Sequence, residues 1–554
     1  MGRRKYVIGI DFGTESGRTL LVDVASGAEI ASAIYHYKNG VIDRVLPGSH
    51  IKLDHNWALQ DPADYIRTLE NVVPSVIKKA RVKADDIIGI GIDFTICTMM
   101  PIKSDGTPLC QLKAYRSNPH SWVKLWKHHA AQPEADAIIN LAQKRREKFL
   151  QLYGGRVSSE WFFPKILQIL NEAPKIYQAT DRFIQAADWL VMQLTGRFRK
   201  SACTAGYKEM WNRKSGYPSI SFLKSLHPKL GNVVQEKIGT DIYPIGTKAG
   251  KLTGAMAKRM GLNPGIAVAT AIGDAHAAVL AAGVTEPGKM VIILGTSNCH
   301  MILSPHEYFI QGVAGVVRDG IVPGYYGYEA GQSGTGDILA WFVRNCVPAV
   351  YEMQANRYKQ DIYSYLQDKA AQVKPGKSGL LALDWWNGNR SILMDADLSG
   401  LLLGMTLATR SEDIFRAIME SIAFGTLKII ETFESGKISV KQIYACGGLA
   451  EKNPVFMQML ADVVNRPIKL VKSEQACALG AAILGAVAAG KMVGGYDSIH
   501  QAARMMGHTK NKIYMPVRRN VLIYKQLYSE YIKLHDYLGI TNNRIMKNLK
   551  QLRD

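Results

Sequence analysis

The stretch Tyr6-Val-Ile-Gly-Ile-Asp-Phe-Gly-Thr14 is an apolar run that ends in an acid and a glycine-containing turn. Two more apolar runs follow at residues 19–23 and 29–34, and turn-forming residues separate each run from the next. Short apolar runs divided by Gly, Ser and Asp are typical of strands joined by tight turns. The beginning of the chain is therefore predicted to fold as a three-stranded antiparallel meander.

A helix and a buried strand are predicted to complete this unit. Across residues 62–80 the apolar side chains recur with the 3.6-residue period of an amphipathic helix. Residues 86–93, with the sequence Asp-Ile-Ile-Gly-Ile-Gly-Ile-Asp, are apolar at consecutive positions. A strand that is apolar on both faces is typical of a parallel sheet covered on both sides.

The same order recurs in the second half of the chain. Apolar runs at residues 288–294 and 299–303 flank the turn Gly295-Thr-Ser297. Patterns typical of helices and of one more strand follow at residues 411–433, 442–445, about 453 onward and 476–489. The repeated meander, helix and strand indicate a duplicated α/β domain with a cleft between the two copies.

The two domains are predicted to cover residues 1–264 and 265–554, the second with a helical tail. The boundary is placed at Gly261-Leu-Asn-Pro-Gly265, because Gly, Pro and Asn cluster there as in a linking turn. The middle of the first domain, about residues 110–260, is helical in pattern and rich in Trp and Tyr. We interpret it as an insert that forms a substrate wall.

The composition excludes several classes of protein. A chain of 554 residues, 47% hydrophobic and 21% charged, suits two or three globular domains. Seven scattered cysteines without a C-x-x-C pair argue against a disulfide framework and a zinc ribbon. The longest nearly apolar stretch, residues 477–490, is shorter than the roughly 18–20 residues of a membrane span. We therefore expect a cytoplasmic protein without a membrane partner.

The formal net charge of +21 is the most unusual feature of the composition. A basic surface suits nucleic acids, and it also attracts small anionic substrates. The basic residues are dispersed along the chain, and no RNP motif, zinc finger or leucine zipper accompanies them. The prediction is that the protein binds no nucleic acid.

Two glycine-containing turns are candidates for binding phosphate. Asp11-Phe-Gly-Thr14 and Gly295-Thr-Ser297 each lie between two predicted strands, at matching places in the two halves. Glycine lets the backbone come close to a ligand, and successive N–H groups can form an anion-binding nest. Facing each other across a cleft, the two turns would hold a polyphosphate from both sides. Asp11 suits a magnesium site beside it, since Mg²⁺ takes one or two carboxylates together with phosphate oxygens.

Asp274 follows a run of small apolar residues, where a strand is predicted to change into a helix. A carboxylate at such a place is either the N-cap of the helix or a general base. The local sequence leaves both interpretations open.

Five motifs together resemble the FGGY family of carbohydrate kinases. In order, they are Asp11-Phe-Gly-Thr14, Gly273-Asp-Ala-His276, Gly295-Thr-Ser297, Gly447-Gly-Leu-Ala-Glu-Lys-Asn453 and Ala478-Leu-Gly-Ala-Ala482. The resemblance extends over nearly the whole chain. It implies an actin-like or hexokinase-like ATPase fold, which is a pair of ribonuclease H-like domains, and an enzyme that phosphorylates a carbohydrate with ATP and Mg²⁺.

The resemblance also implies roles for single residues. Asp11 matches the carboxylate on the metal side, and Asp274 matches the catalytic base. The positions that match ATP contacts are Thr14, Gly295 and Thr296 for the phosphates and Gly448 and Asn453 for the adenine side. The positions expected around the sugar are Ile96, Trp126, Lys208, Asp274 and Glu329.

Further motifs, among them Tyr153-Gly-Gly and Tyr328-Glu-Ala-Gly-Gln-Ser333, resemble members of the family that act on a pentulose. The expected partners are thus a small pentulose and ATP, and a homodimer is the assembly considered. Another pentulose or polyol kinase of the family, such as a xylulokinase, is the alternative within enzymes. A protein of the same fold that uses ATP for conformational change, as actin does, is the alternative of another class.

Ile96 departs from the pattern of the family members that this chain most resembles, in which we expect a small residue such as Ala. Its β-branched side chain is stiff and adds three carbons. We expect Ile96 to crowd the sugar pocket, and the alternative is that it turns into the core.

Overall fold

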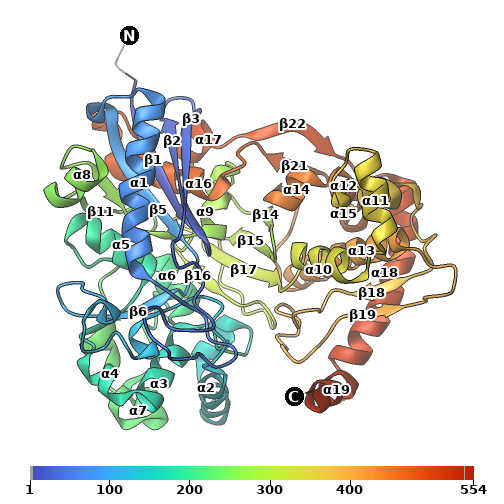
Figure 1. Ribbon diagram of the computed structural model, residues 1–554, viewed down its shortest axis with the longest axis horizontal. Helices are drawn as coiled ribbons and strands as arrows, with labels where there is room; N and C mark the ends of the chain where they lie inside the picture. Colours follow the sequence, from blue (N-terminus) through green and yellow to red (C-terminus); the bar gives the residue numbers. More distant parts are fainter. Residues whose placement is uncertain (1–3, 542, 554) are drawn as a thin grey trace.

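The computed structural model describes residues 4–541 and 543–553. Residues 1–3 of the first predicted domain and residue 554 of the second lie outside the described residues. Two mixed sheets form the centres of two lobes (Figure 1). The first sheet has the order β11-β12-β5-β1-β2-β3, and β13 also pairs with β5. Its strands are β1 (Tyr6–Phe12), β2 (Ser16–Asp23), β3 (Glu29–His36), β5 (Ile87–Phe94), β11 (Lys248–Lys251), β12 (Ala267–Ala269) and β13 (Ile272–Gly273).

The second sheet repeats six strands of the first and adds β16 as a further antiparallel edge strand. Its order is β16-β17-β15-β14-β20-β21-β22. In both sheets a three-stranded antiparallel meander is followed by two parallel strands and an antiparallel edge. The strands are β14 (Lys289–Leu294), β15 (Asn298–Ser304), β16 (Val316–Arg318), β17 (Tyr326–Gln332), β20 (Gln442–Cys446), β21 (Ile468–Val471) and β22 (Thr509–Tyr514). The predicted duplicated α/β fold is confirmed.

Each meander leads into a long helix that returns the chain to the parallel strand. In the first lobe this is α1 (Pro62–Ala80), which begins after Asp61, whose side chain accepts the Ala63 N–H at 2.9 Å. In the second lobe it is α13 (Ser411–Ser435). A run of smaller elements, including α10 (Gly336–Cys346), α11 (Ala349–Arg357) and α12 (Ile362–Gln372), precedes α13 on the right in Figure 1.

The Ala-rich helix α16 (Ala476–Ala489) lies against the sheet of the first lobe, where it contacts β1 and β5. Glycines in these strands allow the helix backbone to approach closely. A Cβ added at Gly9 would lie 1.8 Å from the Ala478 carbonyl oxygen, and one at Gly91 would lie 1.8 Å from that of Ala481. The alternation of Gly and Ile in both strands is thus explained by a helix that comes from the far end of the chain.

The predicted domain boundary at 261–265 is too early. Strands β12 and β13 come after it, yet both pair in parallel with β5 in the first sheet. Gly261, with φ of 64°, is the left-handed C-cap of the short helix α8 (Gly254–Met260). The Gly/Pro turn therefore ends a helix inside the first lobe, and Asp274 follows a strand of that lobe.

The predicted insert, about residues 110–260, is mainly helical and contributes two strands to a small sheet of four, β4-β7-β6-β8. Strands β7 (Val123–Lys124) and β8 (Arg182–Gln185) come from the insert, whereas β4 (Leu59–Gln60) and β6 (Met99–Ile102) precede it in the chain. Its larger helices are α2 (Gln132–Arg145), α3 (Phe162–Glu172), α4 (Pro174–Ala179), α5 (Ala186–Thr195), α6 (Ala202–Lys208) and α7 (Ile220–Leu226). The chain ends in α18 (Arg518–Gly539) and α19 (Ile545–Arg553). None of the helices in the described ranges has the length and apolar character required to cross a bilayer.

Candidate active site

The two predicted phosphate turns are each closed by a backbone hydrogen bond that a glycine donates. In the turn between β1 and β2 the Gly13 N–H donates to the Ser16 carbonyl at 3.0 Å, and between β14 and β15 the Gly295 N–H donates to the Ser297 carbonyl at 3.0 Å. The second turn is also held against the start of α10, because the Gly336 N–H donates to the Gly295 carbonyl at 3.1 Å. Thr14, Gly295 and Thr296 thus lie in turns between strands, as predicted, and their contacts with phosphate stay a prediction.

Two carboxylates lie side by side where β1 and β5 end. Asp11 is paired in register with Asp93 on the neighbouring strand. Burial raises the pKa of Asp93 well above its usual range, and the nearby Asp11 raises it further. Burial also raises the pKa of Asp11, which Arg18 opposes from 3.3 Å. Asp93 was given no role from the sequence, although it ends a buried strand just as Asp11 does.

Asp274 is the first residue of α9 (Asp274–Ala281), and Gly273 holds the N-cap position. Its carboxylate accepts the N–H of the next residue, Ala275, at 2.8 Å. The N-cap interpretation is therefore wrong. Burial raises the pKa of Asp274 to about 7, the charges of Asp11 and Glu329 raise it further, and the Ala275 N–H and Arg390 oppose this shift. Asp274 is thus close enough to Asp11 and to Glu329 for the charges of both to act on it.

Glu329, on β17, is the centre of a buried charge cluster. Its carboxylate accepts from the Lys208 ammonium at 3.0 Å and from the Arg390 guanidinium at 3.1 Å, and the His276 ring nitrogen lies 3.5 Å away. Burial alone would raise the pKa of Glu329, but Lys208, Arg390 and His276 together lower it to about 2. Glu329 is therefore ionised at neutral pH and surrounded by donors.

Arg390 and His276 were not predicted as site residues. His276 belongs to the motif Gly273-Asp-Ala-His276, two residues after Asp274. Arg390 ends the segment Leu383-Asp-Trp-Trp-Asn-Gly-Asn-Arg390, far from it in the sequence. Their side chains join the site only through the folding of distant segments onto β17, which no local pattern indicates.

Two of the predicted sugar residues, Trp126 and Ile96, contact Thr14 and Gly273. The Trp126 indole N–H donates to the Thr14 hydroxyl at 3.1 Å, which joins the insert to the first phosphate turn. The Ile96 side chain lies over Gly273, where an added Cβ would come within 2.4 Å of it. Ile96 therefore lies directly beside the residue that precedes Asp274, and it is partly buried against the core.

The predicted adenine-side residues are at the start of α14 (Gly448–Lys452) and α15 (Pro454–Val464). Gly448 has open space on its side-chain side, whereas a Cβ at Gly447 would lie 2.5 Å from the Leu294 carbonyl oxygen. This close approach brings α14 beside the second phosphate turn. The Asn453 side chain is buried and caps α15 by accepting the Phe456 N–H at 2.8 Å. A contact of Asn453 with adenine stays a prediction.

Models of two domains match the chain: the N-terminal domain of the FGGY family of carbohydrate kinases matches residues 6–281, and its C-terminal domain matches residues 290–489. The chain belongs to the FGGY family of carbohydrate kinases. The resemblance found in the sequence is confirmed, and the protein is a carbohydrate kinase. The N-terminal FGGY model extends past β13, in agreement with the later boundary that the sheet pairing gives.

Relatives within the FGGY family are similar over their whole length. A protein of Halalkalibacterium halodurans named ribulokinase is 54% identical, covering 99% of this chain and 98% of that protein. A Bacillus licheniformis protein of the same name is 55% identical over 97% of this chain and 98% of that protein. The xylulose kinase structure from Rhodospirillum rubrum, at 21% identity, has a TM-score of 0.78 and covers 96% of this chain and 99% of its own. At that identity the structure shows the FGGY fold alone.

Ile96→Ala tests whether Ile96 narrows the sugar pocket. Crowding a packed site costs about 1–3 kcal/mol, so we expect a KM for the sugar that is about 5- to 150-fold lower, with unchanged ATP kinetics. Steady-state kinetics against each substrate measures this. Ile90→Ala, in the buried part of β5, is the control that loses core contacts only. An unchanged sugar KM together with a lower melting temperature would assign Ile96 to the core.

Proposed function

We propose that this carbohydrate kinase transfers the γ-phosphoryl group of ATP to the terminal hydroxyl of L-ribulose, which gives L-ribulose 5-phosphate in the breakdown of L-arabinose. The observation that supports this substrate is the identity of 54–55% over the full length to proteins named ribulokinase. Because the reaction consumes ATP, the proposal places the protein in the cytoplasm.

Asp274 is the general base in this proposal. Its carboxylate takes the proton of the terminal hydroxyl while the hydroxyl oxygen bonds to the γ-phosphorus. The bond from that phosphorus to the bridging oxygen of ADP breaks at the same time, in line with the attack. A base works best when its pKa lies near the working pH, and a pKa of about 7 for Asp274 meets this condition.

The sugar is held by the cluster around Glu329. Its ionised carboxylate would accept hydrogen bonds from sugar hydroxyls, while Lys208 and Arg390 have further N–H groups to donate. Trp126 provides an apolar face for C–H groups of the sugar, and its indole N–H is fixed by Thr14. The proposal therefore places the sugar between Trp126 and Glu329, with its terminal hydroxyl at Asp274.

The phosphates are held by the two turns, where backbone N–H groups and the hydroxyls of Thr14 and Thr296 are the donors. Asp11 and Asp93 fit Mg²⁺, because two adjacent buried carboxylates, of which Asp93 receives no hydrogen bond in the described part of the chain, would gain from a cation. When bound, Mg²⁺ would neutralise negative charge on the phosphate oxygens. No group of three or more possible ligands occurs among residues 4–541 and 543–553, so ATP and water would supply the other ligands.

The pH dependence of the rate tests the protonation state of Asp274. A base with its pKa raised to about 7 is protonated below that pH and cannot accept the hydroxyl proton. We expect kcat/KM for the sugar to fall about tenfold per pH unit below pH 7 and to level off above it. A profile that stays flat down to pH 5 would contradict this assignment.

Steady-state kinetics with coupled detection of ADP tests the choice of substrate. The panel contains L-ribulose, D-ribulose, both xyluloses, ribitol and glycerol. The proposal expects the highest kcat/KM with L-ribulose, and a higher value with a xylulose would favour the xylulokinase alternative. ATP turnover that does not depend on any sugar would favour the actin-like alternative.

A further inference from the structure

We propose that Lys165 and Gln185 are positioning residues that fix the three segments carrying Ile96, Trp126 and Lys208 against one another, and thereby set the affinity for the sugar. Both side chains are buried, and neither is predicted to contact a substrate. The inference rests on the proposed function, in which Ile96, Trp126 and Lys208 line the binding site for the sugar.

The two residues meet at Cys97, which directly follows Ile96. Cys97 has φ of 69°, a left-handed conformation that residues other than glycine rarely adopt. Its N–H donates to the Gln185 side-chain oxygen at 2.8 Å, and its carbonyl accepts from the Lys165 ammonium at 2.8 Å. Both backbone groups of this strained residue are therefore held by side chains from other segments. The direction of the Ile96 loop depends on these two bonds.

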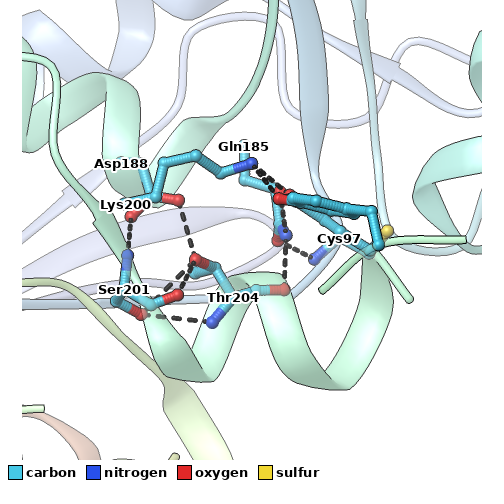
Figure 2. Close-up of polar contacts among 8 residues, drawn as sticks. Cys97, Gln185, Asp188, Lys200, Ser201 and Thr204 are labelled. Carbon is cyan, nitrogen blue, oxygen red and sulfur yellow. Dashed lines mark hydrogen bonds and ion pairs between the residues drawn. The ribbon is translucent and has the colours of Figure 1, made fainter. Parts of the chain in front are cut away.

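Gln185 connects this loop to the helix that ends at Lys208. Its side-chain N–H groups donate to the Thr204 carbonyl and to the Glu209 carboxylate, each at 2.9 Å. Figure 2 shows Gln185 within the network of buried polar contacts that includes Cys97 and Thr204. All three hydrogen bonds of the Gln185 amide are thus used to join the Ile96 loop to α6.

The rest of the network in Figure 2 fixes α6 at both ends. At its start, the Asp188 carboxylate accepts from the Ser201 N–H at 3.1 Å and from the Thr204 hydroxyl at 2.7 Å. At its end, Glu209 pairs with the buried Lys200. The helix that carries Lys208 is therefore held by polar contacts at both ends, and Gln185 links it to the Ile96 loop.

Lys165 connects the same loop to Trp126. Besides the Cys97 carbonyl, its ammonium donates to the Leu125 carbonyl at 2.8 Å, one residue before Trp126. Both acceptors are carbonyl oxygens and not carboxylates, although a buried ammonium group is costly without a counter-charge. Accordingly, burial lowers the pKa of Lys165 to about 8. The proposed role explains why a lysine occupies this unfavourable position: its ammonium group joins the loop of Cys97 to the loop of Leu125.

The test compares Lys165→Met and Gln185→Met with Arg416→Met. Arg416 is a buried cation of the other lobe that also donates to a backbone carbonyl, that of Ala370 at 3.0 Å. We expect each of the first two variants to raise the KM for L-ribulose about tenfold or more, since small misplacements of binding groups have large effects. The KM for ATP should stay within about twofold of wild type. Arg416→Met should lower the melting temperature without changing the sugar KM.

A sugar KM that is unchanged in both variants would overturn the inference, and so would equal increases in the KM values for sugar and ATP. If one of the two variants does not fold, the sugar KM of the other variant decides the test. Lys165→Arg keeps donors for both carbonyls and should therefore restore part of the sugar affinity. Wild-type activity is measured first. If L-ribulose is not its substrate, the proposed function fails, and the variants are compared on the sugar of the panel with the highest kcat/KM.

Discussion

Asp274→Asn should lower kcat by about 10²–10⁴, because it keeps the size of the side chain but removes the acceptor for the hydroxyl proton. The affinity for ATP should change little, since Asp274 is not predicted to bind the nucleotide. The loss of pH dependence below pH 7 should accompany the loss of rate, because the group that titrates at about 7 is gone. Stopped-time assays of ADP formation at saturating L-ribulose measure both effects.

Asp384 offers a matched control for this variant. It is also a buried carboxylate with a pKa raised to about 6 by burial, but it is bonded to the Gln332 amide at 2.7 Å and to the Tyr531 hydroxyl at 3.1 Å. Asp384→Asn should therefore lower stability and leave kcat within about threefold of wild type. Asp274→Asn with more than about a tenth of the wild-type kcat would exclude Asp274 as the general base.

Lys208→Ala and Glu329→Ala should each lower kcat/KM for the sugar by about 10- to 200-fold, because a hydrogen bond to a buried charged group is worth roughly 1.5–3 kcal/mol. The KM for ATP should move much less. Kinetics that vary each substrate separately measure the difference. Equal changes in the sugar and ATP parameters would show that the pair is structural.

An exposed ion pair of the same length is the control for these two variants. Lys214 and Glu307 also approach to 3.0 Å, but the Lys214 side chain is 68% exposed, against 6% for Lys208. Exposed pairs contribute about 0–1 kcal/mol, so Lys214→Ala should leave both KM values unchanged. The comparison separates the effect of a buried sugar contact from that of removing any lysine.

The fold was predictable from the sequence because its strands and helices are marked by local periodicity. The meander of β1 to β3, helix α1 and strand β5 all occur where the apolar patterns place them. The domain boundary was not predictable in this way, because a cluster of Gly, Pro and Asn such as residues 261–265 can either end a helix or link two domains. Only the pairing of β12 and β13 with β5 distinguishes the two cases.

The candidate site could be proposed from the sequence to the extent that its residues occur in motifs that resemble the FGGY family. Lys208 and Glu329 are far apart in sequence, yet the structure brings them to 3.0 Å. The contacts of Arg390 and His276 with Glu329 depend on how β17, α9 and a distant loop pack together, which the sequence of each segment does not contain. The same is true of Lys165, whose proposed role depends on hydrogen bonds to two backbone carbonyl groups.

The most direct test of the central claim is the stoichiometry of the reaction, followed by ³¹P NMR with ATP, Mg²⁺ and L-ribulose. The account predicts one ADP and one phosphomonoester of the sugar, carried on its terminal oxygen, for each ATP consumed, with no reaction when the sugar is left out. Release of inorganic phosphate in place of a sugar phosphate, or ATP turnover that is independent of L-ribulose, would contradict it.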